Sequence, residues 1–138
     1  MPPVDHTLAA LTRSLDEGDL DRVGAVRDGL PVAVVDELVA TGRLTTAELD
    51  RLALARKTLA HRRAVGHLSA DQSDRLLRLL RIIREAEDTF GDPEKARLWL
   101  RRPTAALAGN APLELLDTDV GVRRVETLLG RIGHGIAA

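Results

Sequence analysis

The sequence predicts an all-α protein. Aromatic residues make up only 1% of the 138-residue chain. Leu, Val, Ile and Ala must therefore supply the core, and this composition favours helix packing. Helix-capping residues and helix-stopping Gly or Pro recur along the chain and divide it into short segments. No stretch alternates apolar and polar residues convincingly enough to predict a β-strand.

Residues 1–29 are predicted to form an N-terminal arm of partial order. Leu8, Leu11 and Leu15 keep helical spacing, which the following EGD breaks. A short second helix is expected over residues 20–26, because apolar residues return there.

Residues 30–91 are predicted to hold three short helices and one long one. The first follows Pro31 over VAVVDELVA. Thr45 and Glu48 form a capping box that opens a brief second helix. A third helix is expected over residues 55–64, before a glycine.

The longest predicted helix covers residues 70–89. Ser69 and Gln72 form a second capping box at its start, and Gly91 ends it. The helix has a wide apolar face made of Leu76, Leu77, Leu79, Leu80, Ile82, Ile83 and Ala86.

Residues 92–138 are predicted to form a separate, smaller helical segment. Asp92 and Pro93 are typical of a helix start, and Pro103 closes that helix. After a connector and a short turn over PLELL, Asp117 or Thr118 is expected to cap a last helix over residues 119–132. One face of it carries Val122, Val125, Leu128, Leu129 and Ile132. Phe90 and Trp99 are expected to be core anchors.

Composition excludes several classes of site. The chain has no Cys, so it has no disulfide, thiolate metal site or Cys nucleophile. Its four His lie in separate segments without paired metal spacing, and phosphate-binding glycine loops are absent. We expect no enzymatic activity, no metal and no cofactor. Without a secretory signal or a long apolar run, we expect a cytoplasmic protein with no membrane association.

Charge is balanced overall but not locally. The net charge is −1. The stretch 51–63 nevertheless holds no acid, and its bases are Arg51, Arg56, Lys57, Arg62 and Arg63. Phosphate attraction acts over about 8 Å, so a near-neutral chain can still carry a DNA-facing patch. A solvated helix face is the plain alternative.

The C-terminal segment WLRRPTAALAGNAPLELLDTDVGVRRVETLLGRI closely resembles the toxin-binding domain of Xre/MbcA/ParS antitoxins. The family pattern is met by Ala96, Trp99, Leu100, Pro103, Leu107, Gly109, Pro112, Glu114, Leu115, Leu116, Thr118, Gly121, Val125, Leu129, Arg131, Ile132 and Gly135. The resemblance implies the antitoxin of a type II toxin–antitoxin pair. It also implies a partner, a RES-domain toxin that consumes NAD.

The preceding segment resembles the Xre-like half of the same family. The matching positions are Arg56, Thr58, Leu59, Arg62, Leu68, Ser69, Ser73, Asp74, Arg75, Arg78, Leu79 and Arg81. The resemblance implies a helix-turn-helix, in which the start of the second helix meets DNA bases. The DNA-binding candidates are Arg51, Arg56, Lys57, Thr58, His61, Arg62 and Arg63. The expected turn, ALA at residues 53–55, lacks the usual glycine.

The resemblance also implies that the last helix and the tail cover the toxin's NAD pocket. The toxin-binding candidates are Val125, Leu128, Arg131, Ile132, Gly133, His134, Gly135 and Ile136. A frayed C-terminus is the alternative for the glycine-rich tail after Ile132.

These expectations combine into one hypothesis with two rivals. The chain is expected to be a homodimeric antitoxin that inhibits its cognate toxin and represses its own operon by binding operator DNA. A stand-alone helix-turn-helix regulator and a helical adaptor without DNA binding are the alternatives.

Overall fold

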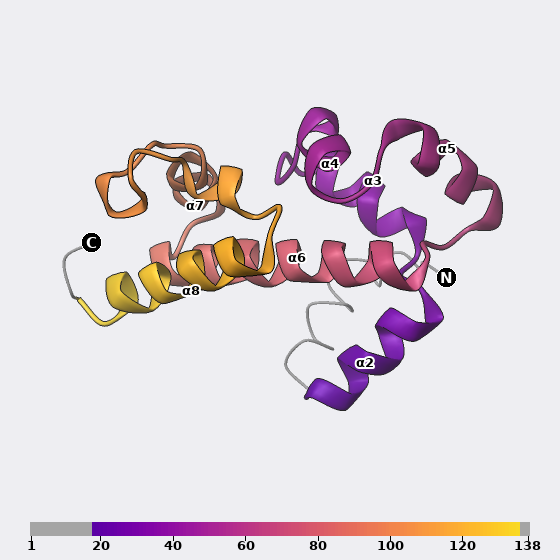
Figure 1. Cartoon of the computed structure of the whole chain (residues 1–138), viewed down its shortest axis with the longest axis horizontal. Coiled ribbons are helices and arrows are strands. Elements are labelled where there is room, and N and C mark those ends of the chain that lie inside the picture. The colour runs from indigo at the N-terminus through magenta and orange to yellow at the C-terminus, as the bar shows by residue number, and fades with distance from the viewer. Residues whose placement is uncertain (1–17, 136–138) are drawn as a thin grey trace. The chain divides into compact units, whose positions relative to one another are not determined.

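The structure is a computed structural model and describes residues 18–135. The α-helices are α2 (Asp19–Asp28), α3 (Val32–Ala40), α4 (Thr46–Leu52), α5 (Arg56–Val65), α6 (Ala70–Phe90), α7 (Pro93–Leu100) and α8 (Asp119–Gly133) (Figure 1). The 3-10 helices η2 (Ala105–Leu107) and η3 (Pro112–Leu115) join α7 to α8. Across the described range there is no strand beyond one isolated bridge, which confirms the all-α prediction. The predicted helical spacing at Leu8, Leu11 and Leu15 lies outside this range.

The chain divides into two compact units between Leu77 and Arg78, inside α6. The sequence predicts a boundary after Gly91, at the end of this helix, and that boundary stays a prediction. Buried residues of α6 lie on both sides of the division between the units. No helix within residues 18–135 is both long and apolar enough to cross a membrane.

The first unit packs α3, α4 and α5 with the first turns of α6. Both predicted capping boxes are formed: Glu48 N donates to Thr45 Oγ1 over 3.1 Å, and Gln72 N donates to Ser69 Oγ over 3.2 Å. The core consists of aliphatic side chains that are almost completely buried: Leu30, Val34, Val35, Leu38, Leu44, Leu49, Leu52, Leu54, Leu68 and Leu76.

Two hydrogen bonds connect the residues that flank the α3–α5 segment. Leu68 N donates to Leu30 O over 2.8 Å, and Leu30 N donates to the buried hydroxyl of Ser73 over 2.8 Å. Gly29 precedes this link with φ +89°, and a Cβ there would lie 2.2 Å from Leu68 O. Only glycine permits this approach, since φ is left-handed and the neighbour is backbone.

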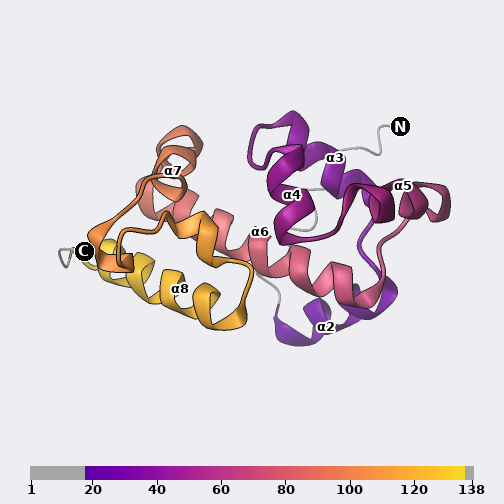
Figure 2. The ribbon, with the colours of Figure 1, turned by 45° about the horizontal axis from the view of Figure 1, so that its top comes forward.

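The second unit places α8 beside the last part of α6, running in the same direction (Figures 1 and 2). Near the start of α8, Asp119 lies 3.8 Å from Arg78, and further along Glu126 lies 3.0 Å from Arg81. At the end of α8, the Cβ position of Gly133 is 4.0 Å from Thr89 Oγ1. The core of this unit is formed by Ile82, Ile83, Ala86, Ala96, Leu100, Leu107, Leu113, Leu116, Val122, Val125 and Leu129.

Local signals place the remaining helix starts of this unit. Asp92 Oδ2 accepts from Lys95 N over 3.3 Å, with Pro93 in the first turn of α7. Thr118 Oγ1 accepts from Gly121 N over 3.0 Å. This hydrogen bond decides between the two predicted caps in favour of Thr118.

The prediction that Phe90 and Trp99 anchor the core is only partly right. Both side chains are half-buried, and their ring centroids lie 5.4 Å apart at 45°. They pack on each other at the edge of the second unit. Aliphatic residues fill its interior because the connectors η2 and η3 bring in leucines.

Glu85 forms part of a charged cluster between α6 and α8. Partial burial raises the pKa of Glu85, and the nearby carboxylate of Glu126 raises it further, while Arg81 opposes the shift. Arg81 Nε donates to Glu126 over 3.1 Å. The Arg81 guanidinium is thus paired with Glu126, so it stabilises the ionised form of Glu85 only weakly.

Replacing Glu85 with glutamine is expected to stabilise the protein slightly at pH 7. A raised carboxyl pKa means that Glu85 favours folding below its ordinary pKa, about 4.3, and loses that contribution as pH rises through the raised value. Partial solvent exposure keeps the effect small, so the thermal midpoint of E85Q should rise on the order of 1–2 °C at pH 7. Near pH 4 the two proteins should melt together. An equal difference at both pH values would assign the effect to packing.

Candidate functional site

The helix-turn-helix is formed by α4, the turn at residues 53–55, and α5. The turn contains no left-handed residue: Ala53 has φ −120° and Ala55 has φ −64°. The missing glycine is therefore no obstacle. Asp50 Oδ1 accepts from Arg56 N over 2.8 Å, so a side chain from α4 satisfies the start of α5. Sequence reasoning missed this contact.

Besides Arg63, four of the predicted DNA-binding side chains are exposed on this motif. Arg51 lies near the end of α4, and Arg56, Lys57 and His61 lie on α5. Within residues 18–135, these four side chains make no hydrogen bond or ion pair. Thr58 is half-buried. Arg56 and Lys57 lie at the start of α5, the part of a recognition helix that meets base edges.

The other two predicted DNA-binding residues already have partners. Arg63 Nη1 donates to Asp36 over 2.9 Å, and this hydrogen bond raises the pKa of Arg63. Arg62 Nε donates to His67 O over 3.0 Å. Both lie in the last turns of α5, and their contacts hold this helix against other residues of the first unit.

The predicted toxin-binding residues divide into buried and exposed groups. Val125 is fully buried and Leu128 is 4% exposed. Val125 therefore lies on the apolar face of α8 in the core of its own unit, and its contact with a toxin stays a prediction. Ile132 is half-buried, and Arg131 is exposed. Ile136 lies outside the described residues.

The predicted tail begins later than expected. Gly133 is the last residue of α8. His134 then caps the helix: its N–H lies 3.1 Å from Gly130 O, and its Nδ1 lies 2.7 Å from the same oxygen. Because a carbonyl only accepts, Nδ1 must carry the proton in this contact. Gly135 follows with φ +79° and ends the helical path.

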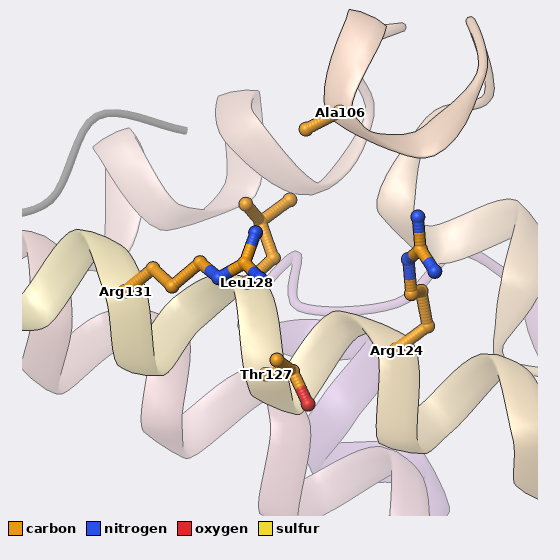
Figure 3. A pocket seen from close by; sticks show the side chains of 5 residues that line it. All are labelled: Ala106, Arg124, Thr127, Leu128 and Arg131. Atoms are coloured by element: carbon orange, nitrogen blue, oxygen red, sulfur yellow. The ribbon is translucent and has the colours of Figure 1, made fainter.

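A small cavity on the second unit was not anticipated. It measures about 240 Å³ and is lined by Ala106, Arg124, Thr127, Leu128 and Arg131 (Figure 3). The spacing of Arg124 and Arg131 was the available signal, because residues seven apart lie on one face of a helix.

Comparison with known families assigns both halves of the chain. Residues 21–81 match the antitoxin Xre-like helix-turn-helix domain. Residues 85–135 match the antitoxin Xre/MbcA/ParS C-terminal toxin-binding domain.

Several curated relatives align over most of their length. An antitoxin Xre of Photorhabdus laumondii is 35% identical over 116 residues, covering 82% of this chain and 78% of the relative. An antitoxin Xre of Pseudomonas putida is 33% identical, covering 80% and 69%. A protein of a Sphingobium species named Prs ADP-ribosylating antitoxin is 30% identical, covering 86% and 82%. With two matching domains and relatives this similar, the chain belongs to the Xre family of antitoxins of toxin–antitoxin systems.

Proposed function

We propose that this antitoxin inhibits a RES-domain toxin by covering its NAD-binding active site, and that it represses its own operon as a homodimer. The toxin-directed surface is the exposed end of α8 with the residues after it: Arg131, Gly133, His134, Gly135 and Ile136. The DNA-directed surface is the start of α5 with the end of α4. The protein acts in the cytoplasm and has no catalytic step of its own.

The observation that carries the toxin proposal is the match of the second unit to a toxin-binding domain. The name of the Sphingobium relative connects a related antitoxin with ADP-ribosylation. ADP-ribosyl groups come from NAD, which supports an NAD-consuming partner. The exposed end of α8 supplies a cation, Arg131, and a narrow glycine-containing segment that suits insertion into a pocket.

Inhibition is tested by expressing the RES-domain protein encoded beside this antitoxin, with and without the antitoxin. Cellular NAD and growth should fall with the toxin alone and recover when both are present. The purified proteins should elute as one complex. A neighbouring toxin of another fold, or NAD loss that persists despite complex formation, would contradict the proposal.

The observation that carries the DNA proposal is the exposed pair of cations at the start of α5, Arg56 and Lys57, whose side chains have no partner within residues 18–135. Arg56→Ala and Lys57→Ala should each weaken operator binding by about 1–3 kcal/mol if the side chain contacts a base. Toxin inhibition should be unchanged, since these residues lie in the other unit. A gel-shift titration at fixed salt measures the effect.

Arg63→Ala is the matched control for this prediction. It lies on the same helix and is exposed, yet its guanidinium is held by Asp36. Its loss should weaken operator binding less than either variant above. If Arg56→Ala and Lys57→Ala both bind like the wild type, α5 is not a recognition helix, and the unit serves as a helical adaptor.

A further inference from the structure

The cavity on the second unit is lined by positively charged side chains. Four of its lining residues, Arg124, Thr127, Leu128 and Arg131, lie on one face of α8, and Ala106 of η2 lies opposite (Figure 3). Leu128 is almost fully buried and forms an apolar wall. Among the residues that the structure describes, the lining includes two guanidinium groups and no carboxylate.

The two arginines lack the partners that neighbouring arginines have. Arg81 pairs with Glu126 over 3.0 Å, and Arg123 pairs with Asp119. Within residues 18–135, the side chains of Arg124 and Arg131 make no hydrogen bond or ion pair. Two positive charges without a partner among residues 18–135 thus face the same small cavity.

The cavity size restricts what it can hold. Sites for small molecules and cofactors usually have volumes of roughly 300–1,000 Å³. At about 240 Å³ and open to solvent, this cavity is smaller than most such sites and has room for a charged side chain of a partner. Guanidinium groups bind carboxylates by charge-assisted hydrogen bonds, and an aliphatic stem would lie against Leu128.

We propose that the Arg124–Arg131 cavity receives a glutamate or aspartate side chain of the toxin. This inference rests on the proposed function, since the occupant belongs to the protein that this unit binds. It adds Arg124 to the interface and gives the chemical class of the contact.

The test measures the affinity of full-length antitoxin for the purified RES-domain protein encoded beside it, by titration calorimetry. Arg124→Ala and Arg131→Ala should each weaken binding by about tenfold or more, as expected for a charged group paired across an interface. Arg124→Lys and Arg131→Lys should recover part of the loss. The affinity of the wild type for the toxin should fall with added salt, and the affinity of the alanine variants should depend less on salt.

Arg123→Ala is the matched control on the same helix. Its guanidinium is paired with Asp119 and does not line the cavity. The affinity of Arg123→Ala for the RES-domain protein should stay within about twofold of the wild-type affinity, because an exposed ion pair usually contributes little. Thermal melting of each variant shows whether a loss of affinity comes from unfolding. If an alanine variant melts early, the lysine variant at the same position is compared with the wild type instead, because it keeps the positive charge.

The outcomes separate this inference from the proposed function. If wild-type antitoxin does not bind the RES-domain protein, the proposed function fails, and this inference fails with it. If the wild type binds and the folded alanine variants bind equally tightly, only the cavity assignment is overturned. If the variants lose operator affinity but keep toxin affinity, the cavity holds a DNA phosphate, and the inference is again overturned.

Discussion

Gly121→Ala is expected to destabilise the second unit by about 3 kcal/mol or more. Gly121 lies in the first turn of α8, where a Cβ would sit 1.8 Å from Leu115 O and 2.8 Å from Leu115 C. The obstacle is backbone, so no change of rotamer relieves it. A small domain is stable by only about 5–15 kcal/mol, so thermal unfolding should show a large drop in midpoint.

Gly130→Ala is the control in the same helix. A Cβ at Gly130 meets nothing within 4 Å. Because alanine is the better helix former, this variant should be stabilised by about 0.5–1 kcal/mol. If the two variants melt alike, the approach of η3 to α8 is not a structural requirement. The pair also tests function, since Gly121→Ala should lose toxin binding and Gly130→Ala should keep it.

Helix starts were predictable because their signals are local. Thr45 with Glu48, Ser69 with Gln72, and Asp92 each lie within three residues of the group they cap. Such contacts depend on chain spacing and not on the rest of the fold. The helices therefore begin close to the predicted residues, and the all-α class follows from them.

Burial and pairing were less predictable because they depend on distant residues. The apolar face of α8 was visible in the sequence, but the sequence does not say whether that face covers its own core or a partner. Val125 belongs to the core. Likewise, Arg63 looked free until Asp36, 27 positions earlier, was brought to it by folding.

The turn of the helix-turn-helix illustrates the same limit. Its sequence, ALA at residues 53–55, lacks the glycine that most helix-turn-helix turns carry. The structure instead uses ordinary backbone angles and the Asp50 carboxylate at the start of α5. The capping residue lies six positions before its partner, across the turn, which is beyond the spacing of a local capping box.

An antitoxin that ends at Ile132 is expected to fold and to bind the toxin, but to fail to protect the cell. The deletion removes Gly133, His134 and Gly135, which are exposed, together with residues 136–138. The fully buried residues of α8 end at Leu129, so the core is retained. Terminal residues beyond the core usually contribute little to stability.

The truncated protein also distinguishes binding to the toxin from blocking of the toxin's NAD pocket. It keeps Arg124 and Arg131, so complex formation with the toxin should persist on a sizing column. It lacks the segment proposed to occupy the NAD pocket, so cellular NAD and growth should fall to the levels seen with the toxin alone. A truncation after Gly135 is the graded control, because it restores the His134 cap of α8. If the protein ending at Ile132 protects as fully as the intact chain, the terminal segment does not enter the pocket, and inhibition must come from the helical surface around Arg131.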